Sequence, residues 1–220
     1  MGRDFKKLSL ISGFSLLEMI AVLTIIGIFS GFLFPLGQQI VYKANLAKDA
    51  HNLRQIALSY CQLLQLNESL DGLKNVINSN DFAVTLARSG GINEASCYSS
   101  FCSKNKPKST NIVDTIGNII GDFNHLPIDW VCLSPLPTNC TLSTTPALYS
   151  QGLNIETGLW EPDSLYGTRG GFIAFLDGHV QFFNNLEGQL VHFKTKRPTK
   201  NITEAVPNYT HAYTSSGRIW

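Results

Sequence analysis

The chain has 220 residues and a mass of 24.3 kDa, enough for one domain of ordinary size or for one compact domain with an appended segment. It carries 17 Lys and Arg residues against 16 Asp and Glu residues, a formal net charge of +1. This balance excludes a nucleic-acid-binding protein that works by bulk positive charge. Hydrophobic residues make up 44% of the chain, and a large share of them lies in one block near the amino terminus.

The amino-terminal block is long enough to cross a membrane. Between residues 14 and 41 the sequence contains a single charged residue, Glu18. A spanning helix needs about 20 apolar residues, whereas the apolar core of a cleaved signal peptide has about 7 to 15. We therefore expect a retained membrane helix over residues 14–37. The excess of positive charge ahead of it predicts a cytoplasmic amino terminus, with the bulk of the chain outside; the basic residues are Arg3, Lys6 and Lys7.

Glu18 is costly in such a helix. A carboxylate at the bilayer centre costs about 2.5–3.5 kcal/mol on insertion scales, and somewhat less near the interface. One interpretation places Glu18 at headgroup depth, where the amino-terminal end of a helix tolerates negative charge. The other interpretation gives it a positively charged partner, and the residues just upstream show where that partner would come from.

The sequence from Gly13 through Phe14 to Glu18 (GFSLLE) resembles the prepilin processing site of the type IV pilin and type II secretion pseudopilin family. The resemblance implies that a prepilin peptidase cuts between Gly13 and Phe14, removes the basic leader 1–13 and N-methylates Phe14. It also implies that the new terminal ammonium is the partner of Glu18. Paired charges attract strongly in an apolar medium. The pair can form between neighbouring subunits or within one subunit, since residues 14 and 18 lie four apart on a helix.

The same resemblance implies a function and a location. We expect a structural subunit without enzymatic activity, held in the bacterial inner membrane by one helix, with a periplasmic head, and later assembled into a type II secretion pseudopilus or a type IV pilus. Its partners would be the prepilin peptidase and N-methyltransferase, other pilin-like subunits and an inner-membrane assembly platform, with no nucleic acid. Two alternatives are a minor pilin whose head binds a ligand, in DNA uptake or adhesion, and a single-pass anchored enzyme or sensor.

Three residues of the membrane helix are candidates for packing and for a local break. Gly27 and Gly31 form a G-x-x-x-G step, which lets helices approach closely. Pro35 cannot donate a hydrogen bond to the Gly31 carbonyl, so a break is expected near residues 31–35. The family resemblance implies a melted stretch there, which lengthens the subunit in the filament. The alternative is that these residues are simply tolerated, as glycine and proline often are in membrane helices.

Beyond the membrane segment the apolar residues recur at three- and four-residue steps, which indicates an amphipathic continuation of the helix over residues 38–66. Its apolar stripe, including Ala44, Ala47, Leu53 and Tyr60, would lie on a globular head formed by residues 67–220. The expected fold is therefore α+β and pilin-like, with one long helix packed on a carboxy-terminal antiparallel sheet. The fold of residues 73–146 is not predicted by any clear pattern.

The clearest pattern in the head is a β-hairpin near residues 171–183. Two aromatic and β-branched runs flank Asp177-Gly178, a pair preferred in two-residue turns where both positions have positive φ. A third strand is expected near residues 190–193, where it would join this hairpin. The end of the hairpin, LDGHV, resembles a carboxy-terminal signature of many pilin-like proteins of large-genome bacteria, in which a His and a glycine pair come first. Here 167–169 is GTR, where the signature has its histidine.

Five cysteines lie in the part of the chain expected outside the cytoplasm, where disulfides are the default. The shortest closures are Cys97 with Cys102 and Cys132 with Cys140, although crossed pairing is also allowed. Cys61, on the helix, would then remain as a small buried apolar residue. A zinc site is the alternative, but the paired C-x-x-C spacing of such sites is missing from the sequence.

We expect no cofactor and no metal site, with one possible exception for calcium. Pseudopilin relatives often bind calcium through a late loop, and residues 156–167 are the place for one, although they carry no dense D-x-D pattern. Asp177 and His179 do not make a catalytic pair by proximity alone, because successive positions of a strand point to opposite faces.

Overall fold

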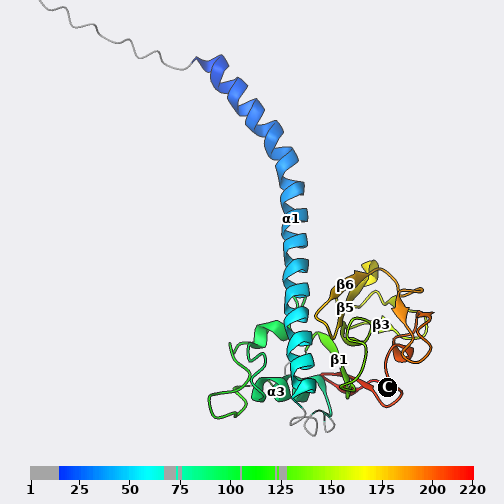
Figure 1. The fold of residues 1–220 in the computed structure, drawn as a ribbon. Coiled ribbons are helices and arrows are strands. Elements are labelled where there is room, and N and C mark those ends of the chain that lie inside the picture. The colour runs from blue at the N-terminus through cyan, green and yellow to red at the C-terminus, as the bar shows by residue number, and fades with distance from the viewer. Residues whose placement is uncertain (1–14, 67–72, 74–75, 105, 122, 124–127) are drawn as a thin grey trace, which may run out of the picture. The chain divides into compact units, whose positions relative to one another are not determined.

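The computed structural model describes residues 15–66, 73, 76–104, 106–121, 123 and 128–220. The chain divides into two compact units, Met1–Ala44 and Asn45–Trp220. The long helix α1 (Leu16–Gln65) begins in the first unit and ends in the second, and an antiparallel sheet follows it along the chain (Figure 1). This is the expected α+β layout, and the helix ends within one residue of its expected end.

The sheet of the second unit has six strands in the order β10-β9-β1-β2-β5-β6, and every neighbouring pair is antiparallel. The strands β1, β2 and β5 are buried along their whole length, which fits their run of apolar residues. The six strands are β1 (Trp130–Ser134), β2 (Pro146–Ser150), β5 (Gly171–Phe175), β6 (Val180–Phe183), β9 (His211–Thr214) and β10 (Gly217–Arg218).

Shorter elements complete the second unit. Two small antiparallel sheets pair β3 (Leu153–Asn154) with β4 (Leu159–Trp160) and β7 (Leu190–Val191) with β8 (Pro198–Thr199). The strand expected near residues 190–193 therefore exists, but it pairs with β8 and does not join the hairpin as expected. The helical elements are α3 (Ser79–Arg88) and the 3-10 turns η1 (Ala95–Tyr98), η3 (Gly167–Arg169) and η4 (Ile202–Glu204).

The expected hairpin is present as β5 and β6, with Gly171 opposite Phe183. Its loop has three residues, not the two that were predicted. The Phe175 N–H donates to the His179 carbonyl at 2.8 Å, which leaves 176–178 as the loop, and only Gly178 there has positive φ (+81°). Loops of this length usually end in one left-handed residue, and glycine takes that position without a steric penalty.

The carboxy-terminal half of α1 supplies one wall of the core. Leu53 and Tyr60 are 0% exposed, as the predicted stripe requires, and the Tyr60 hydroxyl donates to the Leu133 carbonyl of β1 at 3.0 Å. The stripe was predicted to begin earlier, but Ala44 and Ala47 are exposed. Large side chains of α3 and the sheet join the same core, among them Phe82, which packs edge-on against Tyr60 with ring centroids 4.9 Å apart.

The helix continues through residues 31–35, where a break was expected. A proline removes one backbone hydrogen bond, and an α-helix can absorb that loss as a local adjustment without ending. In this single chain the expected break is therefore absent. A melted stretch that forms only on assembly stays a prediction.

Candidate functional site

The amino-terminal end of α1 is closed by a reciprocal capping pair. The Glu18 N–H donates to Ser15 Oγ at 3.2 Å, and the Ser15 N–H donates to Glu18 Oε2 at 3.4 Å. This is the capping box S-x-x-E, which satisfies two backbone donors that a helix start leaves open. The S-x-x-E pattern of Ser15 and Glu18 is a local sequence signal for this capping box. Glu18 thus has a neutral partner within its own chain.

Gly13 and Phe14, the predicted cleavage and methylation residues, lie outside the described residues. The cut and the terminal ammonium therefore stay predictions. The structure does describe the position of Glu18, in the first turn of α1. A carboxylate there is favoured by the helix dipole.

The first half of α1 presents an apolar surface. From Leu16 to Val41 the large apolar side chains whose exposure is described are 44–81% exposed. Thr24 donates its hydroxyl to the Ile20 carbonyl at 2.8 Å, so its polar group is satisfied within the helix. By length and composition, α1 includes a segment that could cross a membrane.

The predicted packing step lies in this exposed half. A Cβ added at Gly27 or Gly31 would meet no atom within 4 Å, so the small-residue strip is open for a close neighbour. Pro35 lies within α1, and its side chain is outside the described part of the chain.

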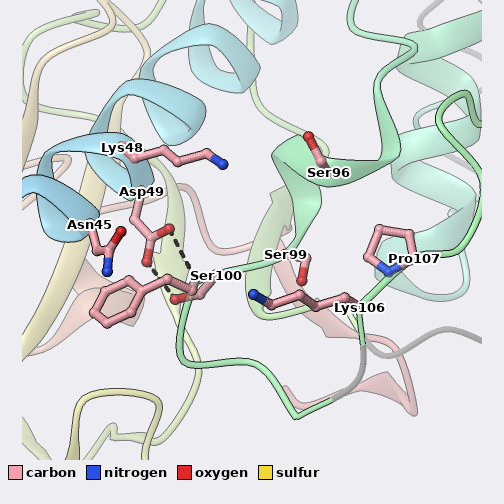
Figure 2. A pocket seen from close by; sticks show the side chains of 9 residues that line it. Asn45, Lys48, Asp49, Ser96, Ser99, Ser100, Lys106 and Pro107 are labelled. Atoms are coloured by element: carbon pink, nitrogen blue, oxygen red, sulfur yellow. Dashed lines mark hydrogen bonds between the residues drawn. The ribbon is translucent and has the colours of Figure 1, made fainter. Parts of the chain in front are cut away.

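The second unit contains a buried carboxylate that the sequence analysis did not single out. Asp49 is 1% exposed. It accepts hydrogen bonds from the Ser100 hydroxyl, from the Tyr166 hydroxyl at 2.7 Å and from the Phe101 N–H at 3.3 Å. Figure 2 shows the carboxylate of Asp49 reaching Ser100. Two segments far apart in the sequence, one with Ser100 and Phe101 and one with Tyr166, are thereby fixed to one helical residue.

A second buried carboxylate continues this network. Asp129 is 8% exposed and accepts a hydrogen bond from the Ser100 N–H at 2.7 Å. Ser100 thus links both carboxylates, donating its hydroxyl to Asp49 and its backbone N–H to Asp129. Burial raises the pKa of both carboxyls, and the hydrogen bonds that they accept oppose that rise.

Asp49 borders a hollow of about 340 Å³. In Figure 2 the side chain of Lys48 reaches across the hollow from α1, and the side chain of Lys106 enters from the facing loop. The oxygens of Asp49 already accept three hydrogen bonds from Ser100, Tyr166 and Phe101. This arrangement suits a structural role, because these three hydrogen bonds hold α1 to the head through Asp49.

Asp49 could have been found from the sequence. It lies four residues before Leu53, seven before Ile56 and eleven before Tyr60, in phase with the apolar stripe of the helix. An aspartate in that phase predicts a buried carboxylate with partners from the head. Its partners could not be predicted, because Ser100 and Tyr166 lie 51 and 117 residues away in the chain.

The residues of the carboxy-terminal signature serve the hairpin. Asp177 Oδ1 accepts from the His179 N–H at 2.8 Å, which is a local turn bond. A Cβ at Gly170 would overlap the Phe183 carbonyl, and a Cβ at Gly171 would overlap the Trp160 indole. The glycine pair is therefore required by close packing.

All five cysteines are free thiols in this structure, so neither Cys97 with Cys102 nor Cys132 with Cys140 is joined. Cys132 is fully buried in β1, and Cys97 is buried beside Gln55, to which its thiol donates at 3.7 Å. Spacing along the chain could not predict which cysteines lie close together, because it does not show where the fold places the Cys61 side chain.

The segment expected for calcium, residues 156–167, is tied by its own hydrogen bonds. Asn154 Nδ2 donates to Glu161 Oε1 at 2.7 Å, and Asn154 Oδ1 accepts from the Glu156 N–H at 3.1 Å. Among the described residues, no group of three or more His, Cys, Asp or Glu side chains could hold a metal ion.

No family model, no curated protein and no solved structure matches this chain.

Proposed function

We propose that the chain is a pilin-like structural subunit, cut between Gly13 and Phe14 and assembled through α1 into a type II secretion pseudopilus or a type IV pilus. One observation carries the proposal: from Leu16 to Val41 the large apolar side chains of α1 whose exposure is described are exposed, with the carboxylate of Glu18 in its first turn. A surface of this size and composition requires lipid or other subunits to cover it.

The proposed cycle gives each part of the helix a role. Before assembly the segment lies in the inner membrane, with the amino terminus in the cytoplasm and the head outside. Removal of the leader creates an ammonium at Phe14, which is a charged partner for Glu18 and replaces the neutral Ser15 N–H of the capping box. In the filament, the helices of neighbouring subunits take the place of lipid, and the step of Gly27 and Gly31 lets them approach.

The test is the intact mass and the amino-terminal sequence of the chain, purified from membranes of cells that contain a prepilin peptidase. We expect a mature chain that begins at N-methylated Phe14. A chain that still begins at Met1 would contradict the proposal. Gly13→Leu is the matched control, because a bulky side chain at the scissile bond should leave the leader attached.

A further inference from the structure

Cys61 and Cys140 lie on two segments that pack on the same loop, residues 176–178 of the hairpin. The Asp177 N–H donates to the Leu142 carbonyl and the Leu176 N–H donates to the Thr145 carbonyl, both at 3.2 Å. These bonds align the segment after Cys140 with the loop.

α1 reaches that loop from another direction. A Cβ built on Gly178 would lie 2.7 Å from Leu58 Cδ2, so Leu58 is packed against the loop. Cys61 lies three residues after Leu58, on the same face of the helix. The Cys61 side chain therefore lies on the side of α1 that faces the hairpin loop, and the segment after Cys140 packs on the same loop.

The electrostatics of the two thiols agree with this placement. Burial raises the pKa of Cys61, and the neighbouring Cys140 and Asp177 raise it further. None of the other three cysteines, Cys97, Cys102 and Cys132, has a cysteine thiol among the described groups that shift its pKa. Cys140 therefore lies near enough to Cys61 to affect its pKa, a pairing different from the shortest closures along the chain.

The two thiols differ in access. Cys61 is 8% exposed, whereas Cys140 is half-buried. The Lys196 ammonium donates to Thr141 Oγ1 at 3.5 Å, next to Cys140, and its positive charge counteracts the effect of burial on the pKa of the Cys140 thiol. Cys140 is therefore the thiol that a dissolved oxidant reaches first.

We propose that Cys61 and Cys140 are a disulfide-forming pair that fastens α1 to the segment beside the hairpin loop. This proposal rests on the proposed function in one respect: the head must lie outside the cytoplasm, where an oxidant that carries a disulfide is present.

The reaction has two exchange steps. The Cys140 thiolate attacks one sulfur of the oxidant's disulfide and expels the other as a thiolate, which takes up the proton that Cys140 lost. The Cys61 thiolate then attacks Cys140 Sγ in the mixed disulfide and expels the second oxidant thiolate, which is protonated in turn. The two cysteines lose two electrons and two protons, and the oxidant disulfide becomes two thiols.

The experiment uses the full chain in a non-ionic detergent, reduced and then treated with oxidised glutathione. Linked peptides are identified by mass spectrometry without reduction. Chymotrypsin is the protease, because no Lys or Arg separates Cys132 from Cys140, whereas a cut after Leu133 does. We expect one internal link, between Cys61 and Cys140, and a loss of two free thiols. A link from Cys140 to Cys132, or no link in a chain whose circular dichroism is native, would overturn the proposal.

Variants complete the test. Cys61→Ser and Cys140→Ser should each abolish the link, whereas Cys102→Ser, which removes an exposed thiol, should leave it unchanged. If Cys102→Ser abolished the link, the assignment would be wrong. A chain with the Cys61–Cys140 link that still begins at Met1 would contradict the proposed function alone. A chain that begins at Phe14 but forms no such link on oxidation would overturn the disulfide alone.

Discussion

The two halves of α1 are both rich in apolar residues, yet they differ in what the chain does with them. From residue 16 to residue 41 the large apolar side chains whose exposure is described are 44–81% exposed, whereas Leu53, Ile56 and Tyr60 are 0% exposed. The buried half also holds polar Asp49, for which the head supplies hydrogen-bond donors. The head thus buries the side chains of the second half, whereas the described apolar side chains of the first half are open to contacts with other molecules.

The largest expected effect is on the buried half. Tyr60→Ala should lower the free energy of unfolding of the head by about 3–5 kcal/mol, because it leaves a cavity and removes the hydrogen bond to the Leu133 carbonyl. Chemical denaturation of the full chain in non-ionic detergent, followed by tryptophan fluorescence, measures the change.

Leu23→Ala is the matched truncation in the exposed half, where Leu23 is 62% exposed. It should change the free energy of unfolding of the head by less than about 0.5 kcal/mol. If the Leu23 and Tyr60 variants lost similar stability, the distinction between the two halves of the helix would be wrong.

The second prediction separates two roles of Glu18. Glu18→Gln keeps an acceptor for the Ser15 N–H and so preserves the capping box, but it removes the charge. Glu18→Ala removes both. We expect both variants to be processed, and both to enter filaments at least about tenfold less than wild type in a competition assay, since tenfold corresponds to only about 1.4 kcal/mol.

One outcome would contradict the role of the Glu18 charge in assembly. If Glu18→Gln entered filaments as well as wild type while Glu18→Ala did not, assembly would require the capping hydrogen bond and not the charge. Pulse labelling of a mixed population, with the two forms distinguished by mass, measures the ratio directly.

Much of the fold could be predicted because its signals are local. The helix bounds followed from an uninterrupted apolar run and then a three- and four-residue period, and the hairpin followed from two aromatic and β-branched runs that flank Asp177-Gly178. The predicted loop length was wrong because an Asp-Gly pair occurs in both two-residue and three-residue hairpin loops. Which of them forms depends on how the backbone closes, here between Phe175 and His179.

The site was less predictable because its contacts are distant in sequence. The Asp49 network joins α1 to Ser100 and Tyr166, and no local pattern encodes that pairing. The strand Leu190–Val191 was predicted, but its partner Pro198–Thr199 was not, since a proline in a short run is a weak strand signal. The capping box, in contrast, is local and follows from the S-x-x-E spacing of Ser15 and Glu18.

The third prediction concerns the loop that Leu58 contacts. Gly178→Ala should destabilise the head by about 1–2 kcal/mol from its positive φ alone, with a further loss from the contact with Leu58. Gly188→Ala is the control, because Gly188 also has positive φ (+65°) but a Cβ there would meet nothing within 4 Å. Equal losses for the two variants would show that Leu58 does not press on the loop. Denaturant midpoints of both variants give the comparison.

The smallest expected effect is a pH dependence of the buried half. Burial raises the pKa of Asp49 above its ordinary value, so the folded state binds the proton more tightly than the unfolded state. The stabilising contribution is therefore complete below the ordinary carboxyl pKa of about 3.9 and is lost as the pH rises through the raised value. The slope for one proton cannot exceed about 1.4 kcal/mol per pH unit.

Asp49→Asn should remove this slope, and Asp114→Asn should act with the opposite sign. Hydrogen bonds, chiefly from the Asn118 N–H, lower the pKa of the exposed Asp114 carboxyl, so its contribution is present above the ordinary carboxyl pKa and is lost as the pH falls through the lowered value. Denaturant midpoints of wild type and both variants between about pH 3 and pH 7 measure the two slopes. If Asp49→Asn kept the wild-type slope, the buried carboxylate would not be titrating in this range. The anchor of α1 would then depend on its hydrogen bonds without any linkage to protons.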